Sequence, residues 1–589
     1  TVVARRRSSP ARSPYQAVAR APSQAASRSA CHPREHAAWA SSTHASAERA
    51  PSAADVGLAS GRVTLDGVER EAVRAIGVDP LVQYLVPGER GRLQVAQQAW
   101  DPAAGEWFDV FADGRAPGEW GHWTGGGMTW NTQCASCHDT GVRRGYDAAA
   151  DTFDTRFDEA GVGCAACHGA VEVRDGGHDV ARPPVGAETC AGCHARRAEL
   201  AEGLDPSAPF LDRFAPQLVD RSDTFWPDGQ VRDEDFEYTA FVGSDMHAAG
   251  VGCTGCHDAH SGALLERGDA ACLRCHAELP GFEAHDRHAP AAGVGCVGCH
   301  MPVTVYMQRD PRHDHGFVIP DPVGRAALGI PDPCGRCHAD RDAAWLGARA
   351  TAWYGDLAGD DRRRATAVAA ARAGDPGAVE PLLDMLERET PGWRAAAGGL
   401  LADFVDQPRV RAALVEALSD ADPLVRFGAA AGLEPAAGAP DVEPALVVAL
   451  SDARRAVRVQ ASRALRHRLD PSAPEAADYA AYLEHNAPMP SALHERGTWA
   501  LARGRLDSAI ADLARAVQLD PRSVALRDSL AVALAAAGRA DEAAEQLRQA
   551  VALDAEDPEL WFRSGLAEAG RGDLAAAASA LERAVERAP

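Results

Sequence analysis

The chain has 589 residues, enough for three or four domains. Its net charge of -24 at pH 7 argues against an extended contact with nucleic acid phosphates. No apolar run approaches the roughly 20 residues that span a bilayer, so we expect no transmembrane segment.

The N-terminal residues 1–30 are rich in Arg, Ser and Pro and lack the apolar stretch of a secretory signal. A disordered tail would explain them, but we favour a truncated or mis-framed end. The next segment, 31–60, opens with Cys31-His32, the second half of the Cys-x-x-Cys-His motif that attaches c-type haem. We interpret 31–60 as a degenerate first haem segment with Cys31 and His32 as its remnants. A lone thiol on a mobile tail is the alternative.

Residues 61–131 have the pattern of a small β-containing region. A run at 92–100 and a second at 106–111 bracket the turn sequence Asp101-Pro-Ala-Ala-Gly105. Two such runs around a Pro/Gly turn predict a β-hairpin.

The segment 132–345 contains seven complete Cys-x-x-Cys-His motifs, numbered 1 to 7 in chain order. Two thiols at this spacing add to the vinyl groups of one haem, and the adjoining imidazole ligates its iron. Zinc sites or redox disulfides would not require His after every second Cys. The cysteines are Cys134, Cys137, Cys164, Cys167, Cys190, Cys193, Cys253, Cys256, Cys272, Cys275, Cys296, Cys299, Cys334 and Cys337. The histidines are His138, His168, His194, His257, His276, His300 and His338.

These motifs predict a multihaem cytochrome c domain of short helices, in which seven haem c groups, or eight with the N-terminal site, replace much of the apolar core. Consecutive motifs are about 20 to 60 residues apart, and haems held so closely would form a chain for electrons. We expect residues 132–340 to unfold without haem.

The sixth ligand of each iron decides the chemistry, because a second His closes the iron and an open position admits a substrate. Histidines outside the motifs are concentrated before residue 340. We predict that most of them are sixth ligands, while their assignment to individual irons stays open. The candidates are His44, His122, His178, His247, His260, His285, His288 and His315, with His32 for the degenerate site.

Two repeats follow the motifs. Trp393-Arg394, Val425-Arg426 and Val457-Arg458 recur at 32 residues, which predicts HEAT-like helical repeats over 355–470. Gly504, Gly538 and Gly572 recur at 34 residues, with matching small and large apolar positions, which predicts tetratricopeptide (TPR) repeats over 478–589. The fold class is therefore mainly α, with a C-terminal α-solenoid of HEAT-like and then TPR repeats. Such solenoids bind protein or peptide partners.

The segment from Trp39 to Trp353 resembles the multihaem cytochromes c of the cytochrome c-552/c-554 type, which also occur fused to TPR repeats. The matching pieces are Ala38-Trp39 with Ser42 and His44, Trp130-Asn131, Val162-Gly163-Cys164, Cys167-His168-Gly169, Cys193-His194-Ala195-Arg196-Arg197, Asp228-Gly229-Gln230, Cys256-His257-Asp258, His260-Ser261-Gly262, Cys299-His300-Met301-Pro302 and Asp314-His315. Members of that group carry eight motifs, so the seven here support the degenerate first site. The resemblance implies electron transfer in the periplasm or at the cell surface.

Two functions remain open. We favour a non-enzymatic, exported electron carrier with redox partner proteins and a solenoid scaffold. The alternative is a multihaem oxidoreductase that converts a small nitrogen or sulfur compound at one open iron. The sequence contains no Lys, and so no Cys-x-x-Cys-Lys motif of the nitrite-reductase type.

Overall fold

The computed structural model describes residues 32–52, 55, 61–111, 113–169, 185–203, 205–277, 285, 287–288, 294–356 and 358–588. The chain forms two compact units, one of residues 1–178 with 519–521 and one of 179–518 with 522–589. Motifs 1 and 2 belong to the first unit, and motifs 3 to 7 belong to the second with both repeats. Cys31 and His178, two candidate ligands, lie outside the described residues.

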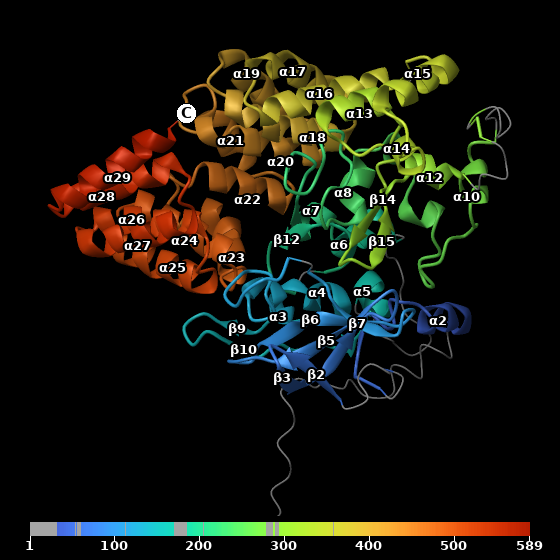
Figure 1. Cartoon of the computed structure of the whole chain (residues 1–589), viewed down its shortest axis with the longest axis horizontal. Coiled ribbons are helices and arrows are strands. Elements are labelled where there is room, and N and C mark those ends of the chain that lie inside the picture. Colours follow the sequence, from blue (N-terminus) through green and yellow to red (C-terminus); the bar gives the residue numbers. More distant parts are fainter. Residues whose placement is uncertain are drawn as a thin grey trace, which may run out of the picture. The chain divides into compact units, whose positions relative to one another are not determined.

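The first unit is built on a five-stranded antiparallel sheet in the order β1-β4-β5-β6-β7 (Figure 1). Its strands are β1 (Glu48–Arg49), β4 (Arg74–Ile76), β5 (Val82–Pro87), β6 (Leu93–Asp101) and β7 (Glu106–Asp109). The hairpin β2 (Arg62–Leu65) and β3 (Val68–Glu71) accompanies the sheet. The predicted hairpin at 92–111 is confirmed as β6 and β7. The sheet is larger than predicted, because strands too short to show a clear alternation, such as β1, join it.

The hairpin turn follows from its residues. The side chain of Asp101 accepts hydrogen bonds from the backbone N–H groups of Ala103 and Ala104, at 2.9 and 2.8 Å. Gly105 then has φ +70°, a conformation that glycine adopts at little cost. This turn fixes the register of the two strands.

Both faces of the sheet are covered, so its central strand β5 is buried from Val82 to Val86. One face packs Tyr84 and Val86 with Trp123, and the other packs Leu85 with Trp130. Around the sheet lie α2 (Pro33–Ala40), η2 (Gly126–Met128), α3 (Trp130–Gln133), α4 (Ala135–His138) and α5 (Cys164–His168). Two strand pairs complete the unit, β8 (Asp139–Thr140) with β11 (Glu159–Ala160) and β9 (Tyr146–Asp147) with β10 (Thr152–Phe153).

The motif-bearing part of the second unit consists of short elements, as predicted. Its helices are α6 (Ala187–His194), α7 (Phe210–Arg213), α8 (Glu237–Val242), α9 (Asp245–Ala248), η3 (Cys253–Gly255), α10 (Ala270–Leu273), α12 (Cys296–His300), α13 (Pro322–Leu328), α14 (Pro333–Cys337) and α15 (Ala343–Tyr354). The strand pairs are β12 (Arg197–Glu199) with β13 (Phe214–Pro216) and β14 (Val303–Tyr306) with β15 (Asp310–His313).

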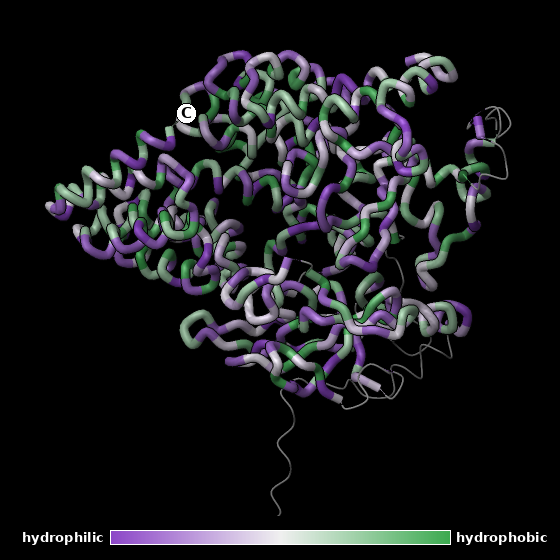
Figure 2. The backbone as a smooth tube through the Cα atoms, in the orientation of Figure 1, coloured by the Kyte–Doolittle hydropathy of each residue, from purple (hydrophilic) through white to green (hydrophobic). Residues whose placement is uncertain are grey.

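Helical repeats form the rest of the second unit. The helices are α16 (Gly359–Arg372), α17 (Val379–Arg388), α18 (Pro391–Leu400), α19 (Pro408–Ala417), α20 (Pro423–Gly432), α21 (Glu443–Ala449), α22 (Arg455–Ala464), α23 (Ala477–His485), α24 (Pro490–Ala502), α25 (Leu506–Leu519), α26 (Val524–Ala536), α27 (Ala540–Leu553), α28 (Pro558–Gly570) and α29 (Leu574–Arg587). Short 3-10 turns, η5 (Pro376–Ala378), η6 (Leu401–Phe404), η7 (Glu434–Ala436) and η8 (Pro474–Ala476), join some of them. Hydrophobic and hydrophilic residues alternate along these helices (Figure 2), as packing in pairs requires. The predicted HEAT-like and TPR solenoid is confirmed.

The arginines of the 32-residue repeat form a ladder between successive repeats. Arg426 donates to both carboxylate oxygens of Asp452, at 2.7 and 3.0 Å. Arg394 and Asp420 make the equivalent pair one repeat earlier. The ladder explains why arginine recurs at this position in the sequence.

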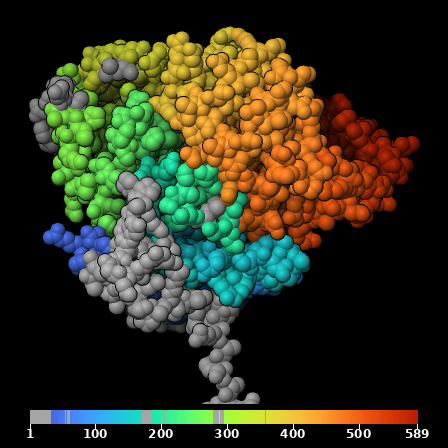
Figure 3. Space-filling model, turned by 180° about the vertical axis from the view of Figure 1, so that it is seen from behind, coloured from blue at the N-terminus to red at the C-terminus, as the bar shows by residue number. Residues whose placement is uncertain are grey.

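The HEAT-like helices share a hydrophobic core with the motif-bearing part. Val219, Phe225 and Tyr306 are buried in one cluster with Leu382 and Trp393 of the repeats. Residues of the two parts also lie directly against one another in the space-filling view (Figure 3). The sequence had suggested that haem fills most of this region, whereas side chains supply a substantial apolar core. No helix among the described residues is long and apolar enough to cross a bilayer.

Candidate haem sites

The fourteen motif cysteines, all among the described residues, form no disulfide and are all at least partly exposed. Five motifs contain or form a helical turn that begins at or next to their first cysteine, in α4, α5, η3, α12 and α14. A helical turn brings residues three apart to the same side, so both thiols of a motif can reach one haem. The thiols and the imidazoles therefore have the chemistry and the exposure that haem attachment requires.

Backbone carbonyls orient several of the motif histidines. The Nδ1 atom of His138 lies 3.1 Å from the carbonyl oxygen of Ala47, and that of His257 lies 3.2 Å from the oxygen of Gly262. The Nδ1 atom of His300 lies 2.8 Å from the carbonyl oxygen of Val318. A donor bond from Nδ1–H fixes the tautomer and leaves Nε2 with the lone pair that a metal needs. These residues thus fit haem iron at Nε2.

His194 differs from these three histidines, because its Nδ1 atom lies 3.0 Å from a carboxylate oxygen of Glu237. A carboxylate partner makes the imidazole a stronger electron donor than a carbonyl partner does. An iron at His194 should therefore have a lower reduction potential than one at His300.

Motifs 1 and 2 are tied together in the first unit. Two residues after His138, the hydroxyl of Thr140 donates to the carbonyl oxygen of Gly161, at 2.8 Å. The hydroxyl oxygen of Thr140 in turn accepts a hydrogen bond from the N–H of Gly163, which directly precedes Cys164, at 2.7 Å. The two motifs are therefore held at a fixed separation.

Motifs 3 to 7 adjoin one another in sequence order. A hydrogen bond from Cys190 lowers the pKa of Cys253, which connects motifs 3 and 4. Burial and then the charge of Cys272 raise the pKa of Cys256, which connects motifs 4 and 5.

Cysteines of consecutive motifs also adjoin one another from motif 5 to motif 7. The pKa of Cys296 is raised by burial, by Asp269 and by Cys272, which connects motifs 5 and 6. Burial, Asp332 and the charge of Cys299 raise the pKa of Cys334, and α12 packs on α14, which connects motifs 6 and 7. The attachment cysteines thus form one continuous series through the second unit.

Residues 39–47, within the segment 31–60, lie against motifs 1 and 2. Trp39 donates from its indole N–H to the carbonyl oxygen of Val162, at 2.7 Å. The backbone oxygen of His44 accepts from the N–H of Val162, at 2.9 Å. His44 is therefore beside motif 2, and His32 occupies the N-cap position of α2.

His122 and His247 have contrasting surroundings. His122 is buried beside Trp123, and its Nδ1 atom lies 2.8 Å from the hydroxyl of Thr124. His247 packs on Phe241, and its buried Nδ1 atom has no hydrogen-bond partner among the described residues. His247 thus has a ring nitrogen available, whereas Nδ1 of His122 is already engaged.

His285 and His288 each face the histidine of a different motif. The ring centroids of His285 and His300 are 6.1 Å apart, with 21° between the ring planes. Those of His288 and His338 are also 6.1 Å apart, with 33° between the planes. Sequence spacing alone could not indicate either pairing.

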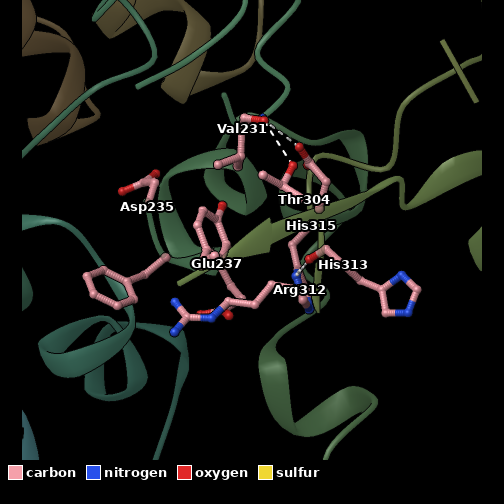
Figure 4. Close-up of a pocket in the computed structure, with 10 residues that line it drawn as sticks. Val231, Asp235, Glu237, Thr304, Arg312, His313 and His315 are labelled. Atoms are coloured by element: carbon pink, nitrogen blue, oxygen red, sulfur yellow. Dashed lines mark hydrogen bonds between the residues drawn. The ribbon is translucent and has the colours of Figure 1, made fainter. Parts of the chain in front are cut away.

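His315 lies beside a small cavity (Figure 4), where its Nδ1 atom is 2.9 Å from the carbonyl oxygen of His313. His260 lies close enough to Asp258 for its charge to contribute to a lowered pKa of that carboxyl, after hydrogen bonds from Ser261. Sequence reasoning missed Asp235, which also lines the cavity. Asp235 is 2% exposed, both of its carboxylate oxygens lack partners among the described residues, and burial raises its pKa to about 7.

Three family models match the chain, each over a part of it. Residues 123–169 match cytochrome c554 and c-prime, residues 355–434 match HEAT repeats, and residues 500–567 match the tetratricopeptide repeat. The class of protein is thus a c-type cytochrome segment joined to HEAT and TPR repeats, as the sequence resemblance implied.

Several solved structures align with the chain at low identity. The outer cell wall cytochrome OcwA aligns at 17% identity and a TM-score of 0.42, over 69% of this chain and 98% of that one. MamA aligns at 16% identity and a TM-score of 0.22, over 27% of this chain and 93% of that one. YrrB, a TPR protein with an unusual peptide-binding site, aligns at 17% identity and a TM-score of 0.20, over 37% of this chain and 94% of that one. No curated protein sequence matches the chain.

Proposed function

We propose that the chain is an exported multihaem cytochrome c that carries electrons along seven, or eight, bis-histidine haems. The observation that supports this most is the continuous series of attachment cysteines from Cys190 to Cys334. Haem iron supplies reversible one-electron chemistry when bound. Attachment sites that adjoin one another keep the electron-transfer distances short without a diffusible carrier.

The residues of the chain have separate tasks in this proposal. The fourteen motif cysteines attach the haems, and the seven motif histidines ligate iron from one side. Backbone carbonyls, such as that of Val318 at His300, hold the ring in the orientation and tautomer that ligation needs. The non-motif histidines close the opposite side, which keeps small molecules away from the metal.

The solenoid would serve as a docking surface for a redox partner. On the first helices of the last two TPR repeats, Val532, Phe562 and Leu566 are 48%, 43% and 53% exposed. The ion pair between Asp528 and Arg563, at 2.6 Å, holds these two helices side by side. An apolar surface of this kind suits a partner segment with apolar side chains.

Phe562→Ala and Leu566→Asp should abolish capture of such a partner from native periplasm and membranes. Val448→Asp, at a 75% exposed position on α21, is the matched control. Capture that survives both changes would place the partner elsewhere.

Export follows from the chemistry of attachment. In bacteria, haem is joined to this motif outside the cytoplasm, so we place the protein in the periplasm or at the cell surface. Domain limits of 31–60, 61–131, 132–345, 355–470 and 478–589 remain our proposal for its organisation.

The deciding experiment is the haem count and the spin state of the purified, fully matured chain. Seven or eight haems per chain, all low-spin in the oxidised protein, are the expected result. A colourless protein with unmodified thiols would refute the proposal. A full haem count with one high-spin iron that binds nitrite or hydroxylamine would instead favour the oxidoreductase.

A further inference from the structure

One short segment approaches two neighbouring motifs at once. His285 and His288 are three residues apart, yet their rings face His300 of motif 6 and His338 of motif 7 respectively. Both ring-centroid separations are 6.1 Å. Two imidazoles that bind one metal ion from opposite sides, each at about 2 Å, have centroids about 6 Å apart.

The two motifs are themselves adjacent. Helix α12, which is motif 6, packs on α14 of motif 7, and the charge of Cys299 contributes to the raised pKa of Cys334 after burial and Asp332. Irons held at His300 and His338 are therefore neighbours in the series. A segment with ligands three residues apart can reach both.

The C-terminal end of helix α15 contacts both His285 and His288. The hydroxyl of Tyr354 donates to the backbone oxygen of His285, at 2.5 Å. The ring of Trp353 lies edge-on to His288, with centroids 6.4 Å apart. The same helix contacts motif 7 through Trp345, whose ring centroid is 5.7 Å from that of His338. These contacts orient the two histidines independently of any cofactor.

We propose that His285 is the sixth ligand of the iron at His300 and that His288 is the sixth ligand of the iron at His338. One segment thereby closes two adjacent irons, and Tyr354 and Trp353 are its positioning residues. This inference rests on the proposed haem c function. It assigns the last two members of the series to electron transfer, because neither iron keeps an open position.

The test uses the full chain, matured with haem, and electron paramagnetic resonance of the oxidised protein. His285→Ala and His288→Ala should each leave the haem count unchanged and convert one low-spin haem to high-spin. The double variant should convert two. In the reduced state, each single variant should bind one carbon monoxide where the parent binds none at these irons. His467→Ala, in the HEAT-like repeats, is the matched control and should change neither signal.

A conservative replacement separates ligation from folding. Methionine also ligates haem iron and raises its potential, so His285→Met should be low-spin with one haem shifted to higher potential. Tyr354→Phe should produce part of the high-spin signal of His285→Ala. An unchanged low-spin spectrum and unchanged potentials in His285→Ala, at full haem count, would overturn the assignment while leaving the haem function intact. Absence of haem from the parent protein would instead refute the function itself.

Discussion

Arg362 donates two hydrogen bonds to the carboxylate of Asp321, at 2.7 and 2.8 Å. Asp321 also accepts a hydrogen bond from the N–H of Gly324 and so caps the start of α13. The pair joins the first helix of the HEAT-like repeats to the motif-bearing part of the second unit. Arg372 adds two hydrogen bonds, to the carbonyl oxygens of Val219 and Phe225, both at 2.9 Å. The repeats thus pack against the motif-bearing part and stabilise it, and do not only tether it.

Arg362→Ala should lower the free energy of unfolding of the second unit by about 1–2 kcal/mol, because it leaves the mostly buried Asp321 without its charged partner. Chemical denaturation of the haem-loaded chain, followed by helical circular dichroism, measures this. Arg363→Ala is the matched control, because Arg363 is on the same helix and its ion pair with Asp360 is well exposed. Equal effects of the two substitutions would contradict the structural role of Arg362.

Phe225→Ala should lower the free energy of unfolding by about 3–5 kcal/mol. Phe225 is fully buried in the core that the motif-bearing part shares with the HEAT-like repeats. The loss should move the unfolding transitions of the haem absorbance and of the helical signal together. Val447→Ala, at a half-exposed position of α21, should change the free energy of unfolding measured from either signal by less than about 0.5 kcal/mol. Separate shifts of the two transitions would mean that the parts unfold independently.

Asp235→Asn should raise the free energy of unfolding above pH 7, by on the order of a few kcal/mol. Burial raises the pKa of Asp235 from 3.8 to about 7, so the folded state binds this proton more tightly than the unfolded state. The stability that the protonated group contributes is therefore complete below about pH 4 and is lost as the pH rises towards 7.

Denaturation midpoints measured between pH 4 and pH 8 give the pH profile of that variant. The parent should lose stability across this range relative to Asp235→Asn, and the two should converge at the acid end. Asp233→Asn, an exposed neighbour, should follow the parent. A constant difference at all pH values would show that Asp235 does not titrate in this range.

Production of the chain without haem maturation should leave residues 132–340 open to proteolysis, because the motifs there rely on covalent attachment and ligation for order. The helices α24 to α29 should resist, since their cores are built within the TPR repeats, as with Ala509, Leu513 and Leu547. Mass spectrometry of the fragments identifies the cleavage sites. Protection of the motif region equal to that of the haem-loaded chain would contradict the dependence on haem.

The sequence by itself determined the features that depend on local spacing. The seven motifs, the hairpin of β6 and β7, and the two repeat periods were all readable, because each reflects a local rule of attachment, turn or helix packing. Gly504 shows this well: its place at the 34-residue period is matched by φ +69° between two helices, where a side chain would be strained.

Only the tertiary structure decided which distant residues meet. The facing of His285 with His300, the series of thiols from Cys190 to Cys334 and the burial of Asp235 depend on loops whose paths no periodicity encodes. The bond between Arg362 and Asp321 joins residues 41 positions apart in two parts that the sequence presents as separate. Apolar side chains such as Phe225 are too sparse in sequence to predict a core, and they become one only when the repeats supply the opposite surface.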